Sequence, residues 1–111
     1  MKFEESSLKD VPVLKVLESR ITADVAPAFK EGLTAHTAKA GRSVVLDLSQ
    51  VTFIDSSGLG ALIGSLKAMD SDCELLLCGA TESVVSMFKL TRMNKVFRIF
   101  TTPEEAVAAI S

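Results

Sequence analysis

Two adjacent serines stand between an apolar stretch and a glycine-rich one, in the order Asp55-Ser56-Ser57-Gly58. A serine hydroxyl can attack a substrate when a base removes its proton, cap the start of a helix, or accept a phosphoryl group. The only histidine, His36, lies among small and polar residues and is expected to be solvated on the surface. The Gly-x-Ser-x-Gly sequence of hydrolases occurs at neither serine. Nucleophilic catalysis is therefore not predicted.

The following glycines match a nucleotide-binding loop only in part. Gly58, Gly60 and Gly64 follow an apolar stretch, but the third glycine comes one residue too late for the Gly-x-Gly-x-x-Gly fingerprint. Cys73 and Cys78 lie on a predicted strand with their side chains on opposite faces, so they cannot share a metal or form a disulfide. We predict no cofactor, no metal site and no enzymatic activity.

A phosphate on Ser56 would meet favourable chemistry if a helix begins there. One serine hydroxyl can accept a hydrogen bond from a free N–H of the first helical turn, which explains one of the two serines but not both. A phosphate carries about −1.5 to −2 charges, and the start of a helix stabilises anions. Phosphorylation is expected to leave the fold intact and to change what binds there, with Asp55 adding negative charge for a partner to meet.

The elements that must position these residues alternate between strand and helix patterns. Apolar runs and alternation predict five strands, over residues 3–7, 11–18, 44–48, 73–78 and 96–100. Helical spacing and capping residues predict four helices, over 22–40, over 57–69, after Thr81 and after Thr102. Phe53 and Ile54 continue the apolar chain beyond the 44–48 strand. We predict an α/β fold, with a mixed central β-sheet of about five strands and about four α-helices packed on it.

The predicted helix over 57–69 has two distinct faces. Its large apolar residues share one face and are expected to pack on the sheet: Leu59, Leu62, Ile63, Leu66 and Met69. Gly60, Gly64 and Ala68 recur on a different face. Glycine costs an exposed helix interior up to about 1 kcal/mol relative to alanine, so this stripe needs a reason. Close packing inside the domain and close approach of another protein's backbone both supply one.

The whole chain limits what the protein can bind. Its 111 residues suffice for one domain, predicted over residues 1–111. With 12 Lys+Arg against 14 Asp+Glu and no basic run, direct nucleic-acid binding is not expected. Uninterrupted apolar runs, such as Leu75 to Cys78, are far shorter than the roughly 20 residues of a membrane span. Glu4 and Glu5 stand where a signal peptide would be apolar, so a cytoplasmic protein is expected.

Residues 45–60, VLDLSQVTFIDSSGLG, closely resemble the signature of STAS domains of the anti-sigma factor antagonist (anti-anti-sigma factor) type. The resemblance covers essentially the whole chain. Residues 26–30 resemble the family's first helix, 74–79 the strand before its third helix, and 84–90 the segment that leads to its last strand. It implies that the chain is a single STAS domain.

The resemblance also implies a partner switch. In this family the unphosphorylated antagonist binds an anti-sigma factor that is also a serine kinase; phosphorylation by that kinase abolishes binding, and a PP2C-type phosphatase restores it. The acceptor directly follows the motif aspartate, which makes it Ser56 here. The implied partner-binding residues are Asp55, Ser56, Ser57, Gly58, Leu59, Gly60, Gly64 and Thr22. A monomer or weak dimer is expected.

Two other functions stay open on the sequence. One is a STAS subunit held without phosphorylation in a larger assembly, such as an ABC transporter or a stressosome-like complex, for which the glycine stripe alone would serve. The other is a sensor of a small ligand or nucleotide.

Two positions depart from the family's pattern. Many members carry Gly-x-Leu-Asp between the second strand and the first helix, so Thr22 here replaces an aspartate that lies near the phosphoacceptor. Kinase recognition or partner identity is expected to differ accordingly. Arg92 replaces the glycine of a common Ser/Thr-Gly-Leu turn, which removes the flexible residue from that turn.

Overall fold

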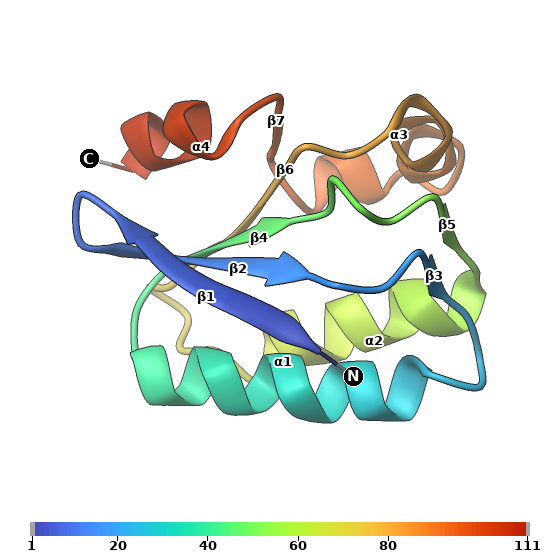
Figure 1. Ribbon diagram of the computed structural model, residues 1–111, viewed down its shortest axis with the longest axis horizontal. Coiled ribbons are helices and arrows are strands. Elements are labelled where there is room, and N and C mark those ends of the chain that lie inside the picture. Colours follow the sequence, from blue (N-terminus) through green and yellow to red (C-terminus); the bar gives the residue numbers. More distant parts are fainter. Residues whose placement is uncertain (1, 111) are drawn as a thin grey trace.

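The computed structural model describes residues 2–110, so Met1 and Ser111 of the predicted 1–111 domain lie outside it. A five-stranded mixed sheet forms the centre of this range, in the spatial order β1 (Phe3–Leu8), β2 (Val11–Val16), β4 (Val44–Asp47), β6 (Leu75–Cys78) and β7 (Ile99–Phe100) (Figure 1). β1 runs antiparallel to β2, and the other neighbouring strands are parallel. The predicted α/β class and mixed sheet are confirmed.

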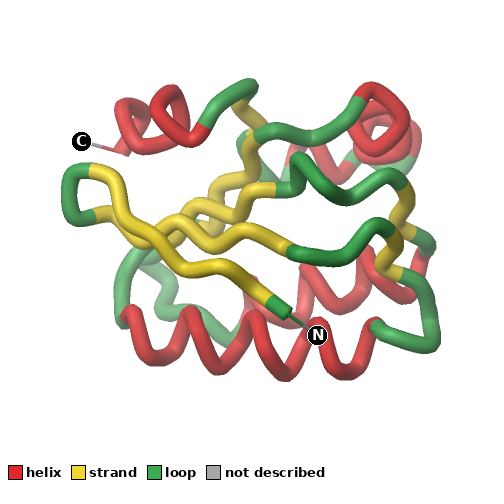
Figure 2. Tube along the Cα trace, viewed as in Figure 1, coloured by secondary structure: helices red, strands yellow, loops and turns green. Residues whose placement is uncertain are grey.

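Within residues 2–110, four α-helices cover the sheet: α1 (Ala26–Ala40), α2 (Ser56–Lys67), α3 (Glu82–Leu90) and α4 (Pro103–Ile110). α1 and α2 lie together on one side of the sheet and α4 on the other (Figures 1 and 2). One face buries Leu77 in a cluster with Phe29 of α1 and Leu62 of α2. The other buries Leu76 with Val107 of α4. Cover on both faces explains why β6 is apolar throughout.

A two-residue turn, Lys9 and Asp10, joins β1 to β2. Both residues have positive φ, 50° and 68°, as a type I′ hairpin turn requires. Leu8 and Val11 face each other across the turn, so the predicted antiparallel opening pair is confirmed, although β2 ends at Val16 rather than at residue 18.

The first helix begins later than predicted. The Thr22 carbonyl accepts the N–H groups of Val25 and Ala26 at 3.0 and 2.8 Å, which forms a turn ahead of the helix. α1 therefore starts at Ala26 rather than at residue 22. It ends where predicted, because Gly41 adopts the left-handed conformation, with φ of 61°, that terminates many helices.

The last strand is shorter than predicted. A 3-10 turn, η1 (Met93–Lys95), carries the chain to Phe97, whose N–H donates to the Met93 carbonyl at 2.9 Å. Only Ile99 and Phe100 pair with β6, so residues 96–98 of the predicted strand belong to the connection. β6 likewise begins at Leu75, which leaves Cys73 outside the strand where it was predicted.

A second, two-stranded parallel sheet was not predicted. It pairs β3 (Arg20–Ile21) with β5 (Phe53–Ile54). The Arg20 guanidinium lies 4.7 Å from the centre of the Phe53 ring, a cation–π contact across the pair. Phe53 and Ile54 thus form their own strand beside β3 rather than extending β4.

His36 is less exposed than its sequence neighbours predicted. Its Nδ1 contacts the Glu5 carboxylate, and its ring packs edge-on against Phe3 with 5.3 Å between ring centroids. The histidine is half-buried because α1 lies against β1. Within residues 2–110, no helix combines the length and apolar character needed to cross a bilayer.

Candidate functional site

The small β3–β5 sheet brings two loops together at the start of α2. Its strands are parallel, and Ile21 is the register partner of Ile54, so the residues that follow both strands emerge at the same edge. The Asp55 N–H donates to the Ile21 carbonyl at 3.2 Å, which continues the pairing. Thr22 and Asp55 are thereby neighbours despite their separation in the sequence.

Asp55, rather than a serine, caps α2. One carboxylate oxygen, Oδ1, accepts the N–H of Gly58 at 2.9 Å, the bond of a helix N-cap. The other, Oδ2, accepts the N–H of Ala23 at 3.0 Å. A single carboxylate therefore holds both the helix start and the neighbouring loop, and the serine-capping interpretation is wrong.

Ser56 and Ser57 occupy the first two positions of α2, and both are exposed. Within residues 2–110 neither hydroxyl makes a hydrogen bond, and neither backbone N–H has a partner. Free N–H groups are inherent to the first turn of a helix, where they can receive an anion. Both hydroxyls are therefore available to chemistry from outside.

Gly58 and Leu59 face inward. A Cβ on Gly58 would lie 2.5 Å from the Ile21 carbonyl oxygen and 2.6 Å from a methyl carbon of Ile54. Glycine at this position lets α2 approach the small sheet closely. Leu59 is 8% exposed and belongs to the core. Through these buried contacts, the two residues hold the start of α2 against the small sheet and the core.

Little of the domain itself packs against Gly60 and Gly64 of the glycine stripe. A Cβ on Gly60 would meet nothing within 4 Å, and one on Gly64 would meet only the end of the Lys30 side chain, with Cε at 2.7 Å. Gly60 is exposed beside Ser57 in an open groove of about 380 Å³ between α1 and α2. Close packing inside the domain therefore does not explain Gly60.

The buried face of α2 also differs from the predicted one. Leu59 and Leu62 are buried, but Ile63, Leu66 and Met69 are only half-buried. Ala61 and Ser65 fill the remaining core positions, and the Ser65 hydroxyl donates to the Ala61 carbonyl at 2.9 Å. Small residues are needed there because α1 packs closely on α2.

Thr22 contacts an acidic residue, Asp24, that is not part of the motif. Its hydroxyl donates to the Asp24 carboxylate, and this hydrogen bond lowers the pKa of Asp24. Asp24 is exposed in the loop that Asp55 holds through Ala23. The loop thus carries a carboxylate although Thr22 is not acidic. No periodic pattern or motif in the sequence points to Asp24.

Both cysteines are free thiols whose pKa values are raised. Burial, with Asp47 and Glu104 nearby, raises the pKa of the Cys78 thiol to about 12. Desolvation and two acids nearby, Asp70 and Asp72, raise the pKa of Cys73. Within the described range, the ligand atoms of Asp70, Asp72 and Cys73 form the only group of three close enough to hold a metal, at a mostly exposed turn away from the serines.

Comparison with known proteins identifies the class. The family model described as "STAS domain" matches residues 8–106, nearly the whole chain. The chain therefore belongs to the STAS domain family. It is 32% identical, over 71% of its length and 70% of the relative's, to the anti-sigma-B factor antagonist of Listeria monocytogenes. The family and type that the motif resembled are thus confirmed.

Solved structures share the fold. An anti-sigma factor antagonist from Mycobacterium paratuberculosis superposes with a TM-score of 0.86 at 24% identity, covering 97% of this chain and 92% of that one. The Bacillus cell fate determinant SpoIIAA in its phosphorylated form superposes with a TM-score of 0.67 at 14% identity, covering 99% and 100%. At these identities the likeness concerns the fold.

Proposed function

We propose that this chain is an anti-sigma factor antagonist that works as a phosphorylation-controlled partner switch in the cytoplasm. Its unphosphorylated form binds an anti-sigma factor that is also a serine kinase, and so releases that factor's target. Phosphorylation of Ser56 abolishes binding, and a PP2C-type phosphatase restores it. The chain is the substrate of both enzymes and is not itself an enzyme. The name of the Listeria relative supports the partner class.

The observation that carries the proposal is that Asp55, and not Ser56, caps α2. Because Asp55 takes the capping role, the exposed Ser56 hydroxyl is free to accept a phosphoryl group without unfolding the start of α2. The unpartnered N–H groups of Ser56 and Ser57 can then stabilise the phosphate. A fold that also exists in a phosphorylated form, that of SpoIIAA, is consistent with this arrangement.

The proposed partner footprint surrounds Ser56. Ser57, Gly60 and Gly64 offer a low surface on α2, and Thr22 borders it from the neighbouring loop. Asp55, Gly58 and Leu59 support this surface from beneath. A phosphate adds about −1.5 to −2 charges next to the carboxylates of Asp55 and Asp24. A partner surface that accommodates the serine hydroxyl would then have to accommodate the larger phosphate and the negative charge concentrated around it.

Phosphorylation is tested by partner capture followed by a kinase assay. Wild-type protein, Ser56→Ala and Ser57→Ala are expected to capture the anti-sigma factor from an extract of the source cells, and Ser56→Asp is expected to lose it. Incubating the captured kinase with ATP should add one phosphate to wild type and to Ser57→Ala, and none to Ser56→Ala, by mass spectrometry. A phosphate on Ser57, or equal capture by Ser56→Asp, would refute the assignment.

The footprint is tested separately with Gly60→Ala. Because the added methyl meets nothing in the domain, the free protein is expected to gain up to about 1 kcal/mol of stability from helix propensity. The same methyl should weaken binding to the captured partner if a backbone approaches Gly60 closely. Unchanged affinity in this stabilised variant would remove Gly60 from the footprint and leave Ser56 untouched.

A further inference from the structure

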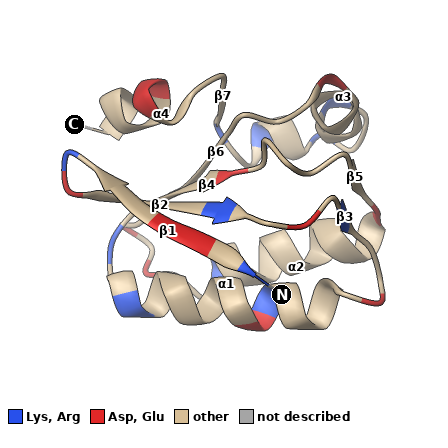
Figure 3. Ribbon diagram, in the orientation of Figure 1, with Lys and Arg blue, Asp and Glu red and all other residues tan. Residues whose placement is uncertain are grey.

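Basic residues gather in the connection between α3 and β7. Residues 89–98 contain four of the chain's 12 basic residues and none of its 14 acidic ones, although the whole chain has a net charge of −2. We define the α3–β7 surface by the exposed basic and large apolar residues of this segment: Lys89, Leu90, Arg92, Lys95, Val96 and Arg98. Figure 3 shows basic residues in this region. Arg98 is already paired with Glu74, at 2.6 and 2.7 Å.

The three remaining basic residues have no acidic partner. Within residues 2–110, Lys89, Arg92 and Lys95 form no ion pair. Their charges are directed to solvent on a protein that is acidic elsewhere. An acidic ligand would gain attraction here that no group of the described chain supplies.

Two large apolar side chains are exposed on the same surface. Leu90 is 85% exposed and Val96 is 49% exposed, and within the described residues only Phe53, at 37%, is another exposed large hydrophobic residue. Phe53 is covered in part by Arg20, whereas Leu90 and Val96 alternate with the basic residues. Exposed apolar residues with a charged rim are typical of protein interaction sites.

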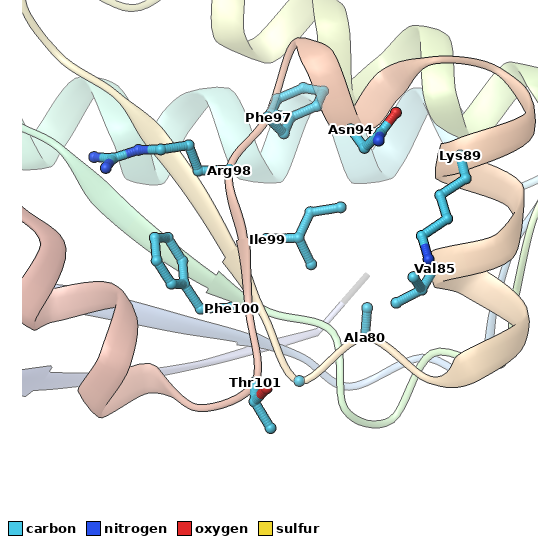
Figure 4. A pocket seen from close by; sticks show the side chains of 10 residues that line it. Ala80, Val85, Lys89, Asn94, Phe97, Arg98, Ile99, Phe100 and Thr101 are labelled. Atoms are coloured by element: carbon cyan, nitrogen blue, oxygen red, sulfur yellow. The ribbon is translucent and has the colours of Figure 1, made fainter.

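A groove runs beside this surface along β7. It has a volume of about 540 Å³, and its lining includes Ala80, Val85, Lys89, Asn94 and Ile99. Figure 4 shows the Ile99 side chain directed into the groove toward Val85 and Ala80, with Lys89 extending from α3 beside them. Arg98 points to the opposite side of β7. The groove therefore has an apolar floor and a basic wall.

The groove borders an open edge of the sheet. β7 is the last strand in the sheet order of the described residues. The N–H of Leu77 donates to the Arg98 carbonyl at 3.0 Å, and the N–H of Gly79 donates to the Phe100 carbonyl at 3.1 Å. In a parallel pair the intervening residue, Ile99, turns its own peptide groups away from β6. An open edge of this kind accepts another strand.

We propose that the α3–β7 surface binds an acidic, extended segment of a partner protein. The segment pairs with the free edge at Ile99 and places alternate side chains over Val85. Its carboxylates face Lys89, Arg92 and Lys95. This second contact goes beyond the switch at Ser56.

Other occupants fit the surface less well. A nucleic acid would use the three free charges but would leave the apolar floor, Leu90 and Val96 uncovered. A second copy of the chain could offer its own β7 edge, where two basic surfaces would repel each other, or its β1 edge. There Glu5 is already paired with His36, and Glu4 stands opposite Lys15.

The test uses a capped synthetic peptide of alternating glutamate and valine as the probe, followed by amide NMR shifts and fluorescence anisotropy. Saturable shifts are expected at Ile99, Thr101 and Lys89. The same peptide with proline in place of valine should not bind, because proline cannot donate a backbone hydrogen bond. The variant Lys89→Glu/Lys95→Glu should bind about tenfold more weakly at low salt, and the matched variant Lys2→Glu/Lys39→Glu should bind as wild type does.

Several results would overturn this proposal. The first is a Lys89→Glu/Lys95→Glu variant that binds the peptide as tightly as wild type, and the second is a set of amide shifts confined to other elements. The others are the same shifts when protein concentration is raised without peptide, and binding of single-stranded DNA without binding of the peptide. Ser56→Asp should bind the probe normally, so failure of this proposal is distinguishable from failure of the Ser56 switch.

Discussion

Removing the Asp55 carboxylate should loosen the site and the small sheet together. In Asp55→Ala two hydrogen bonds to the carboxylate are lost, from Gly58 at 2.9 Å and from Ala23 at 3.0 Å. Loss of an N-cap costs typically about 1 kcal/mol. The second bond, to a charged but solvent-exposed acceptor, contributes about 1 kcal/mol more. We expect Asp55→Ala to lower the free energy of unfolding by about 2 kcal/mol.

The Asn variant separates the two bonds. Asp55→Asn keeps one carbonyl oxygen that can cap Gly58, but its amide group presents N–H donors to the N–H of Ala23. Its expected loss is about 1 kcal/mol, between wild type and Asp55→Ala.

Urea denaturation followed by circular dichroism measures these differences, and thermal unfolding of Asp55→Ala should have a midpoint about 8 °C lower. Asp24→Ala is the matched control, because it removes the same charge from the adjacent exposed loop and loses only the exposed hydrogen bond from Thr22, with no helix cap; it should lower the free energy of unfolding by at most about 1 kcal/mol. If Asp55→Ala unfolds within about 0.5 kcal/mol of wild type, the carboxylate does not hold the site as described.

Three further changes have defined outcomes. Gly58→Ala should destabilise the domain by about 2 kcal/mol in urea denaturation, because its methyl would collide with the Ile21 carbonyl; a loss smaller than that of an ordinary surface change would contradict the packing. Arg92 has φ of 62°, so Arg92→Gly should raise the free energy of unfolding by about 1 kcal/mol, and Arg92→Ala, which keeps a Cβ in that conformation, should not. Cys78 should resist iodoacetamide in the native protein at about pH 8, whereas the unfolded protein should react. Since burial raises the pKa of this thiol to about 12, the unfolded state releases the proton first, and stability should fall as pH rises from the ordinary thiol pKa towards 12; Cys78→Ala should lack that slope.

The sequence alone determined the order of the main elements and the family signature that contains Asp55-Ser56-Ser57-Gly58. The mostly apolar residues 44–48 and 73–78 are typical of strands buried on both faces, which predicts central parallel strands. Local capping is also readable, since Thr81 and Thr102 accept the N–H groups of Val84 and Glu105 as expected. These features depend on neighbouring residues, so their signal is contained in short stretches of sequence.

Only the tertiary structure decided how the site is built. β3 and β5 have two residues each, too few for a periodic pattern, and they become strands because they pair with each other. That pairing brings Ala23 to Asp55, which gives the capping carboxylate its second hydrogen bond. Likewise, positive φ at Arg92 follows from the path of η1 rather than from any preference of arginine. Contacts between distant residues have no local signature, so the bond from Ala23 to Asp55, the open space at Gly60 and the groove along β7 emerge only when the chain has folded.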